Sequence, residues 1–367
     1  MKMKVIISGG GTGGHIFPAI AIAQEILSRK KDTKILFVGA NGKMEMEKVP
    51  AAGFTITGLD IAGFNRSSFL KNIGLPYKVL KSFFQAYKIN ASYKPDVVIG
   101  VGGYASWPTL YTANWIGIPT LIQEQNSFAG KSNIHLGKKA RKICVAYEGM
   151  DKFFAKDKII LTGNPVRKDL VNMDAKKPEA ISYFGLDANK KTILIMGGSL
   201  GSKTINETVD ANLTLMKEQK DVQWIWQFGK QGIGVYDTPD YASPNIRSMP
   251  FIERADLAFA AADVILCRAG ALTISELLIA QKPAILVPAP YVAEDHQRHN
   301  ALSLEIKGAA MMIPDSESKS KAIQQIISLV RDDLKQSQMK SAQVALARPD
   351  AAKCIVDEIF KLIPQAA

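Results

Sequence analysis

The sequence predicts an α/β protein with two domains, each built around a parallel sheet. Short runs rich in Val, Ile and Leu alternate with helical patterns, as in chains that wind strand, helix, strand. The alternation starts again in the second half of the chain, which indicates a second sheet. With 367 residues, of which 47% are hydrophobic, the chain is long enough for two domains with their own cores.

The strands are predicted first, because each is a continuous apolar run of the kind that parallel sheets bury on both faces. The first set covers residues 5–8, 34–38, 96–100 and 120–123. The second set covers residues 192–196, 223–228, 263–267 and 283–287. From about residue 318 the pattern is helical, with a break at Arg348-Pro349 and a final amphipathic helix over 351–362.

The domain junction is predicted at Leu161-Thr-Gly-Asn-Pro165, where a short strand ends in turn residues. An N-terminal domain then covers residues 1–163 and a C-terminal domain covers 164–367. The final helix, over 351–362, could also pack back on the first domain.

Charge is divided unevenly between these domains. Residues 1–163 contain 22 Lys+Arg and 10 Asp+Glu, whereas residues 164–367 contain 24 of each. The whole net charge of +12 therefore belongs to the first domain. Such asymmetry indicates a polyanionic or membrane-surface partner. A solvated lysine face that aids solubility would give the same counts.

Composition disfavours several classes of protein. The three cysteines lie far apart, so neither a disulfide framework nor a CxxC metal site is expected. The four histidines are not spaced as zinc ligands. No apolar run approaches the roughly 18 residues that span a bilayer, and the amino end lacks the apolar core of a signal peptide. We therefore expect a protein that stays inside the cell.

The first glycine motif, Gly9-Gly-Gly-Thr-Gly-Gly-His15, stands between a predicted strand and a helix that begins near Pro18. Its N–H groups can approach a ligand closely, and the helix N-terminus favours negative charge. The spacing also satisfies G-x-G-x-x-G, but Gly39-Ala-Asn-Gly stands where a nicotinamide cofactor needs an acidic residue. Nicotinamide binding is therefore the weaker interpretation, and a purely structural turn stays open.

Two more turns repeat the order of strand, glycines and helix. Met196-Gly-Gly-Ser-Leu-Gly201-Ser-Lys-Thr204 can cradle an anion, with Ser199 placed to donate to a phosphate. It is not a P-loop, because Ser202 replaces the second glycine of that pattern. Gly100-Val-Gly-Gly-Tyr104 follows a strand of the first domain.

A fourth segment, Arg268-Ala-Gly-Ala-Leu-Thr-Ile-Ser-Glu276, follows a second-domain strand and opens a helix. Arg268 and the N–H groups after it could meet a diphosphate, and Glu276 could accept hydrogen bonds from a ribose. Alternatively, Glu276 only satisfies the helix dipole. The sequence contains no Asp-x-Asp, so a metal-chelated diphosphate is not expected.

Taken together, these segments resemble the MurG family of glycosyltransferases, which makes lipid II for peptidoglycan. The matching segments are collinear: Gly-Gly-Thr-Gly-Gly-His (10–15) with Phe-Pro (17–18), Gly-Gly-Tyr (102–104), Glu-Gln-Asn (124–126), Gly-Asn-Pro-Val-Arg (163–167), Gly-Gly-Ser-Leu-Gly (197–201) and Arg-x-Gly-Ala-Leu-Thr-Ile-Ser-Glu (268–276). Three positions depart from the family pattern. Gln123 stands where His is common, Ser202 replaces Ala, and His296 replaces one of two adjacent glutamines.

The resemblance implies a GT-B fold, in which two Rossmann-like domains face a cleft and the C-terminal one holds the donor. The implied reaction is an inverting transfer of N-acetylglucosamine (GlcNAc) from UDP-GlcNAc to the 4-hydroxyl of the N-acetylmuramoyl sugar of lipid I, with no cofactor and no metal. The implied location is peripheral, on the cytoplasmic face of the bacterial plasma membrane. Anionic inner-leaflet lipids and other cell-wall synthesis proteins are the further partners it suggests.

The resemblance also implies roles for individual residues. Ile252 would read uracil through its backbone and Glu276 would bind the ribose. The further UDP-GlcNAc contacts would be Thr12, Gly13, Gly14, Asn126, Arg167, Ser199, Ala271, Leu272, Thr273 and Gln297, with Arg268 supporting the diphosphate. The turn at 12–14 could also receive the diphosphate of the acceptor.

Three residues are the catalytic candidates that the resemblance places at the reacting centre: His15, Tyr104 and Glu124. His15 is the best candidate for the base, because imidazole titrates near working pH and a helix N-terminus favours its neutral form. Glu124 is the rival, either as the base or as the group that orients the imidazole. A histidine that only ties the loop to its neighbours stays open.

A basic, aromatic-rich amphipathic stretch between residues 66 and 94 is the candidate membrane surface. The residues that we expect to form this surface are Lys71, Lys78, Lys81, Phe83, Phe84 and Lys88. An ordinary helix that packs its phenylalanines inward would show the same pattern. Nucleic acid is not an expected partner, because no nucleic-acid motif occurs.

Other functions remain as alternatives to the transferase. A UDP-sugar epimerase or another GT-B enzyme would share the fold but would not need the basic, apolar face of the first domain. A nicotinamide-dependent dehydrogenase would share the first glycine motif without its acidic partner. A non-catalytic sugar-nucleotide-binding module would show no turnover.

Overall fold

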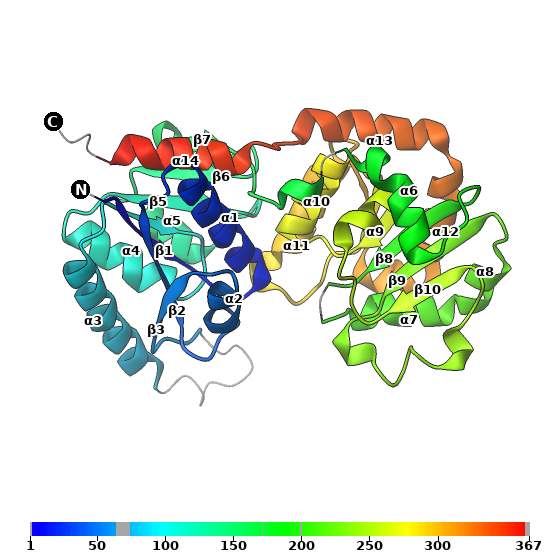
Figure 1. The fold of residues 1–367 in the computed structure, drawn as a ribbon, viewed down its shortest axis with the longest axis horizontal. Coiled ribbons are helices and arrows are strands. Elements are labelled where there is room, and N and C mark those ends of the chain that lie inside the picture. The colour runs from blue at the N-terminus through cyan, green and yellow to red at the C-terminus, as the bar shows by residue number, and fades with distance from the viewer. Residues whose placement is uncertain (1, 64–73, 171, 199, 364–367) are drawn as a thin grey trace. The chain divides into compact units, whose positions relative to one another are not determined.

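The computed structural model describes residues 2–63, 74–170, 172–198 and 200–363 (Figure 1). The chain forms two compact units. Unit 1 comprises Met1–Val166 and Arg348–Ala367, and unit 2 comprises Arg167–Ala347. The predicted junction follows residue 163, and the structural division follows Val166.

The segment 348–367, which belongs to unit 1, contains three Lys+Arg and three Asp+Glu. Unit 1 therefore keeps the whole positive excess.

Among the described residues, unit 1 forms a seven-stranded parallel sheet in the order β3-β2-β1-β4-β5-β6-β7. The strands are β1 (Lys4–Ser8), β2 (Lys34–Ala40), β3 (Thr55–Leu59), β4 (Val97–Gly100), β5 (Thr120–Glu124), β6 (Lys142–Val145) and β7 (Ile159–Leu161). The α-helices are α1 (Gly13–Arg29), α2 (Glu45–Ala51), α3 (Leu75–Tyr93), α4 (Ser106–Trp115), α5 (Lys131–Gly137) and α14 (Ala351–Leu362). Short 3-10 turns lie at Met150–Lys152 and Lys156–Lys158.

Both faces of this sheet carry a hydrophobic core, because successive residues of a strand point to opposite sides. Val5 and Ile7 of β1 pack in the core shared with α1, α2 and α14. Ile6 between them packs in the core shared with α3, α4 and α5. All three side chains are fully buried, which is why β1 reads as an unbroken apolar run.

The end of the chain completes unit 1. In Figure 1 the red ribbon of α14 runs beside the blue ribbon of α1, and the two helices are in contact. Ile355 and Ile359 of α14 are fully buried in the core that covers β1. An ion pair of 2.5 Å joins Asp357 of α14 to Arg29 of α1.

Among the described residues, unit 2 forms a six-stranded parallel sheet in the order β10-β9-β8-β11-β12-β13. The strands are β8 (Lys191–Met196), β9 (Val222–Gln227), β10 (Ile246–Met249), β11 (Val264–Cys267), β12 (Ala284–Leu286) and β13 (Met311–Met312). The α-helices are α6 (Met173–Phe184), α7 (Lys203–Ala211), α8 (Leu213–Glu218), α9 (Ala255–Ala261), α10 (Ala271–Ala280), α11 (His296–Glu305), α12 (Ser318–Arg331) and α13 (Asp333–Leu346). Short 3-10 turns lie at Lys168–Leu170, Lys230–Gly232, Pro239–Tyr241, Ala293–Asp295 and Asp315–Glu317.

Large aromatic side chains fill one face of the unit 2 sheet. Trp224 and Trp226 of β9 are fully buried against α7 and α12, together with Ile193 and Ile195 of β8. The intervening Leu194 is equally buried on the opposite side. The unit therefore has the same three-layer construction as unit 1, and the predicted α/β class is confirmed.

The strands predicted from sequence all form, and each end falls within two residues of the expected one. The strands not predicted are β3, β6, β10 and β13. Three of these, β3, β10 and β13, are edge strands, which have a neighbour on one side only and do not require a continuous apolar run. Thr55-Ile-Thr-Gly-Leu59 of β3 is an example.

Within the described residues, no helix is both long and apolar enough to cross a bilayer.

Truncating Ile355 tests whether the end of the chain stabilises unit 1. Ile355→Ala should lower the free energy of unfolding by about 2–5 kcal/mol, because it leaves a cavity between α14, α1 and the sheet. Cys354→Ala, at the exposed neighbouring position, should change it little. Chemical denaturation measures both, and equal stability of the two variants would contradict this packing.

Candidate active site

The glycine turns found in the sequence all follow strands at the points where the strand order reverses. In unit 1 the order reverses between β1 and β4, and in unit 2 it reverses between β8 and β11. Parallel sheets bind ligands in the crevice outside the carboxyl ends of the strands at such a switch point. The topology therefore gives each unit one candidate site, built from two glycine-bearing segments.

In unit 1 the two turns touch through their backbones. The Gly10 N–H donates to the Gly102 carbonyl at 3.3 Å, which links the turn after β1 to the turn after β4. A Cβ atom added to Gly103 would lie 2.3 Å from the Gly10 carbonyl oxygen. Gly103 also has a φ of +87°, which L side chains rarely adopt. Glycine is required here because the backbones approach too closely for a side chain.

His15 is held at this contact. Its Nδ1 lies 3.0 Å from the Gly10 carbonyl oxygen and 3.3 Å from Thr12 Oγ1. A carbonyl oxygen can only accept, so Nδ1 carries the proton and Nε2 is the basic nitrogen of the neutral ring. Nε2 lies against Gly102, where an added Cβ would approach it to 2.8 Å. The turn therefore selects the tautomer that a general base needs at Nε2.

Glu124 is engaged by its own loop. Its side chain is only 2% exposed, and its oxygens accept from the Asn126 N–H at 3.0 Å, the Gly130 N–H at 3.1 Å and Asn133 Nδ2 at 2.8 Å. The Asn126 amide adds a longer contact of 3.4 Å. Burial raises the pKa of Glu124, while these donors oppose the rise. This geometry favours a role in holding the loop that carries Asn126, and the catalytic role remains a prediction.

Buried amides that were not among the candidate site residues connect this loop to the turns. Gln123 Nε2 donates to Asn164 Oδ1 at 2.8 Å, and Asn164 Nδ2 donates to the Gln125 carbonyl at 3.1 Å. Gln125 Nε2 in turn donates to the Val101 carbonyl at 2.8 Å. Gln123, which departs from the family pattern, thus acts as a structural link between β5 and the segment after β7.

Glu45 is a second residue that the sequence pattern missed. It is the first residue of α2, its side chain is 1% exposed, and its carboxylate accepts from the Gly11 N–H at 2.8 Å. The other oxygen accepts from the Ala40 N–H at 3.0 Å. No sequence signal marked Glu45, because its contact with Gly11 joins segments 34 residues apart. The Gly11 N–H is therefore already used by the protein.

The remaining unit 1 candidates surround this turn. Thr12 is the N-cap of α1, and Gly13 and Gly14 begin its first turn without a side-chain cap. Tyr104 is 47% exposed, and its ring packs on Gly63, where an added Cβ would lie 1.9 Å from Cζ. The structure therefore gathers Thr12, Gly13, Gly14, His15 and Tyr104 on the two linked turns.

In unit 2, Arg167 and Glu276 are brought together. Arg167 Nε and Nη2 both contact Glu276 Oε1, at 3.1 and 3.0 Å, although the residues are far apart in sequence. Burial raises the pKa of Glu276, and the Arg167 charge opposes the rise. Among the described residues, Glu276 Oε2 makes no hydrogen bond. One carboxylate oxygen is therefore fixed while the other can accept.

The N-terminus of α10 lies beside this pair in sequence. Gly270 is its N-cap and has no side chain with which to cap the first turn. Ala271, Leu272 and Thr273 form that turn, which favours an anion through its aligned N–H groups. The Ile252 side chain is 4% exposed, and within the described residues its main chain makes no hydrogen bond. Recognition of uracil by this main chain remains a prediction.

Arg268 has a different environment from the one expected. Its Nε donates to Ser202 Oγ at 2.9 Å, and its Nη1 donates to the Val287 carbonyl at 3.0 Å and pairs with Asp315. The guanidinium thus ties the end of β11 to the turn after β8 and to the end of β12. Its main contacts are with the protein, and support of a diphosphate remains a prediction.

Gln297 lies in the first turn of α11, and its Oε1 accepts from the Ala289 N–H at 2.9 Å. The two residues before this helix have unusual backbones, because Glu294 and Asp295 have φ values of 49° and 50°. Each non-glycine residue with such a backbone angle costs roughly 1–3 kcal/mol of folding free energy, and these residues concentrate at functional sites. Ser199 lies outside the described residues.

Comparison with known proteins agrees with this construction. The family model for the glycosyltransferase family 28 N-terminal domain matches residues 5–145, and that for the C-terminal domain matches residues 192–355. A relative from Bacteroides thetaiotaomicron is 50% identical over 98% of each chain, and is named UDP-N-acetylglucosamine–N-acetylmuramyl-(pentapeptide) pyrophosphoryl-undecaprenol N-acetylglucosamine transferase. The chain belongs to the MurG family of glycosyltransferases.

Solved structures confirm the predicted GT-B fold class. MurG from Acinetobacter baumannii is 30% identical, with a TM-score of 0.78, and the match covers 98% of this chain and 99% of that one. UDP-GlcNAc 2-epimerase from Neisseria meningitidis has a TM-score of 0.68 at 15% identity, covering 98% and 100% of the two chains. The epimerase similarity shows the fold alone.

The expected membrane surface of this MurG-family chain lies on α3, with Lys71 outside the described residues. Lys78, Phe84 and Lys88 are exposed, Phe84 by 62%. Phe83 is half-buried, because its ring packs 5.8 Å from both Tyr111 and Trp115 of α4. The exposed apolar side chains that share this surface are Tyr77, Leu80, Phe84, Tyr87, Trp115 and Ile116, which we call the α3–α4 patch. Sequence reasoning missed the contribution of α4.

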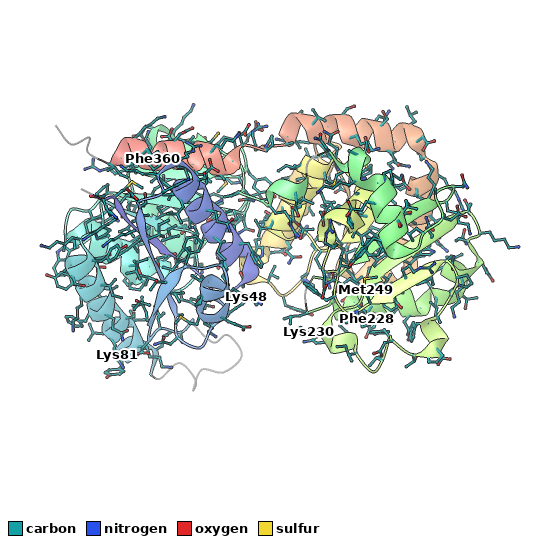
Figure 2. All side chains as sticks on the ribbon, in the orientation of Figure 1. Lys48, Lys81, Phe228, Lys230, Met249 and Phe360 are labelled. Atoms are coloured by element: carbon teal, nitrogen blue, oxygen red, sulfur yellow. The ribbon has the colours of Figure 1, made fainter. Side chains whose placement is uncertain are left out.

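Lys81 differs from Lys78 and Lys88, because it is paired within the described residues. Lys81, labelled in Figure 2, contacts Asp60 at 2.9 Å, and Gln85 and Asn41 donate to the same carboxylate at 3.0 and 2.6 Å. These donors lower the pKa of Asp60 to about 2, and Lys81 makes the largest contribution. Lys81 therefore serves the packing of α3 on the end of β3.

Within the described residues, no three His, Cys, Asp or Glu side chains are grouped in a way that could hold a metal ion. The anion-favouring features of unit 2 are a helix N-terminus and Arg167.

Removing the Lys81 charge should release Asp60. In Lys81→Met the pKa of Asp60 should rise from about 2 toward 3.8, measured by NMR titration of its carboxyl carbon. The stabilisation from ionised Asp60 is present above about pH 3.8 and is lost as the pH falls toward 2, so the variant should lose the part of that dependence that Lys81 supplies, while Asn41 and Gln85 keep theirs. Lys88→Met, an exposed control on the same helix, should leave the titration unchanged. An unshifted Asp60 in Lys81→Met would refute the ion pair.

Proposed function

We propose that this transferase moves GlcNAc from UDP-GlcNAc to the 4-hydroxyl of the N-acetylmuramoyl sugar of lipid I, forming the β-1,4 bond of lipid II. The proposal rests on a relative that is named for this transfer and is 50% identical over 98% of each chain. The two switch-point sites suit the two parts of this reaction. The site in unit 2 offers recognition of an anion and of hydroxyl groups, and the site in unit 1 offers a base.

Unit 2 supplies donor recognition. The main chain of Ile252, which makes no hydrogen bond within the described residues, is proposed to meet the edge of uracil, which has both donors and acceptors. Glu276 Oε2 suits a ribose hydroxyl, since Arg167 occupies only Oε1. The α10 N-terminus at Ala271–Thr273 suits the diphosphate, and Arg167 would neutralise part of its charge. Ser199, which lies outside the described residues, is proposed to donate to the same group. Asn126 and Gln297 are proposed to contact the GlcNAc sugar.

Unit 1 supplies the chemistry. The oxygen of the acceptor hydroxyl attacks the anomeric carbon, the bond from that carbon to the β-phosphate oxygen breaks, and the configuration inverts. The hydroxyl proton passes to His15 Nε2, and the electron pair leaves with UDP. The Gly10 carbonyl stabilises the imidazolium that forms, because it accepts from Nδ1. Tyr104 and the turn at Thr12–Gly14 are proposed to contact the acceptor.

The reaction is proposed to need no cofactor and no metal. The charge that develops on UDP would be met by the α10 N-terminus and by Arg167, both of which are fixed before the reaction. Activity should therefore persist in a chelator, and a strict requirement for a divalent cation would contradict this part of the proposal.

The acceptor is a lipid, and the α3–α4 patch is proposed to seat unit 1 on the cytoplasmic face of the plasma membrane. Aromatic and aliphatic side chains on two helices are exposed together with Lys78 and Lys88. A neighbouring open pocket of about 580 Å³ is lined by Lys139, Arg141 and Lys142. Positive charge beside exposed aromatic rings suits anionic lipids, and unit 1 carries the whole positive excess.

The dehydrogenase alternative is disfavoured by Glu45. In dinucleotide-binding domains the pyrophosphate lies over the glycine turn after β1. Here the Gly11 N–H is bonded to a buried carboxylate, which would repel a diphosphate at that point.

The direct test is a transfer assay with radiolabelled UDP-GlcNAc and a lipid I analogue, with and without chelator. A labelled lipid product that appears only with both substrates is expected. Release of free sugar or epimerised UDP sugar without a lipid product would reject the proposed reaction.

Donor binding should depend on Glu276. Glu276→Gln should weaken UDP binding about 10-fold to 100-fold, because a charged acceptor for the ribose is lost and Arg167 is left without its partner. Glu218→Gln removes an exposed charge elsewhere in unit 2 and should bind as the parent does. Calorimetry measures both. Unchanged UDP affinity in Glu276→Gln would show the ribose assignment to be wrong.

Membrane binding should depend on the exposed lysines of α3. Replacing Lys78 and Lys88 together by Gln should weaken binding to anionic vesicles about 10-fold or more, with activity on a soluble short-chain acceptor retained. Replacing Lys335 and Lys340, which are exposed on α13 of unit 2, is the matched control. Vesicle sedimentation at two salt concentrations measures the difference. Equal loss in both double variants would mean that net charge, and not this surface, governs binding.

A further inference from the structure

The carboxylate of Glu45 and the ring of His15 are attached to the same peptide group. The Gly11 N–H, which donates to Glu45 Oε2 at 2.8 Å, and the Gly10 carbonyl, which accepts from His15 Nδ1 at 3.0 Å, belong to the one peptide unit between these glycines. A peptide unit is planar, with its N–H and C=O pointing in opposite directions. Holding the N–H therefore sets the direction of the carbonyl.

We propose that Glu45 is the positioning residue for His15: its buried carboxylate orients the catalytic imidazole through the Gly10–Gly11 peptide. The proposal rests on the proposed function, in which His15 accepts the acceptor proton. The Glu45 carboxylate accepts from the Gly11 N–H, and the Gly10 carbonyl of the same peptide accepts from His15 Nδ1–H. This leaves Nε2 as the basic nitrogen of the ring. Glu45 thus takes the orienting role that sequence reasoning offered to Glu124.

The surroundings of Glu45 show that the site is shaped around its carboxylate. A Cβ atom added to Gly10 would lie 2.2 Å from the Glu45 carboxyl carbon, and one added to Gly39 would lie 2.6 Å from its Cγ. Two separate backbone segments therefore lack side chains where Glu45 lies. Both carboxylate oxygens are used by backbone N–H groups, of Gly11 and Ala40.

The charge of Glu45 is needed for this arrangement. Within the described residues no Lys or Arg pairs with it, so a carboxylate 1% exposed is held by two N–H donors. Burying a carboxylate without a cation is unfavourable, and proteins retain it where it has a use. A neutral amide cannot replace it, because only one of its two terminal atoms accepts. An ionised acceptor also polarises the peptide and strengthens its C=O as an acceptor.

The test is Glu45→Gln in the full chain, with Glu47→Gln as control. Glu47 lies two residues away on the same helix, is exposed, and carries the same charge. Ring ¹⁵N chemical shifts of the four histidines, with His15 assigned by its own substitution, report which nitrogen carries the proton. Parent and Glu47→Gln should show His15 in the Nδ1–H form. In Glu45→Gln that form should lose population, kcat should fall about 10-fold to 100-fold, and UDP affinity should stay unchanged.

Gly39→Ala provides a second variant that keeps the charge. Its added methyl should displace the Glu45 side chain, so it should reproduce both the tautomer change and the fall in kcat. It decides the matter if Glu45→Gln does not fold by circular dichroism. A parental His15 spectrum in a folded variant overturns the proposal, whether or not kcat falls. A parent without transferase activity would instead defeat the proposed function, and the tautomer measurement would still stand.

Discussion

The close backbone approach of the turns after β1 and β4 is the constraint on which the unit 1 site depends. The Gly10 N–H reaches the Gly102 carbonyl, and Gly103 leaves no room for a side chain between the two turns. The Gly10 carbonyl lies beside this contact and meets His15, and Glu45 is proposed to set its direction. A residue larger than glycine at either turn would separate them and remove the partner that selects the tautomer.

In unit 2 a side chain, and not a close backbone approach, joins the two switch-point segments. Its two switch-point segments, after β8 and β11, are joined by Arg268, which contacts Ser202 and the end of β12. This leaves the N-terminus of α10 without a side-chain cap and leaves Arg167 and Glu276 as the charged groups beside it. The difference matches the proposed roles, since unit 1 orients a base and unit 2 receives an anion.

Sequence was sufficient for the fold class, the predicted strands and the glycine turns, because apolar runs and glycines report burial and backbone approach directly. It brought His15, Arg167 and Glu276 forward as candidates but could not show that Arg167 pairs with Glu276, because that contact joins distant segments. Glu45 was missed for the same reason. Lys81 could not be distinguished from its neighbours, since its pairing with Asp60 depends on how α3 lies on the sheet.

In the proposed reaction, unit 1 carries out the proton transfer and unit 2 recognises the nucleotide. The most direct measurement is single-turnover transfer by His15→Ala together with calorimetric UDP binding to the same variant. We expect a rate constant lower by about 10²–10⁴-fold, with UDP affinity close to that of the parent. A parental rate constant in a variant that is folded by circular dichroism would contradict it.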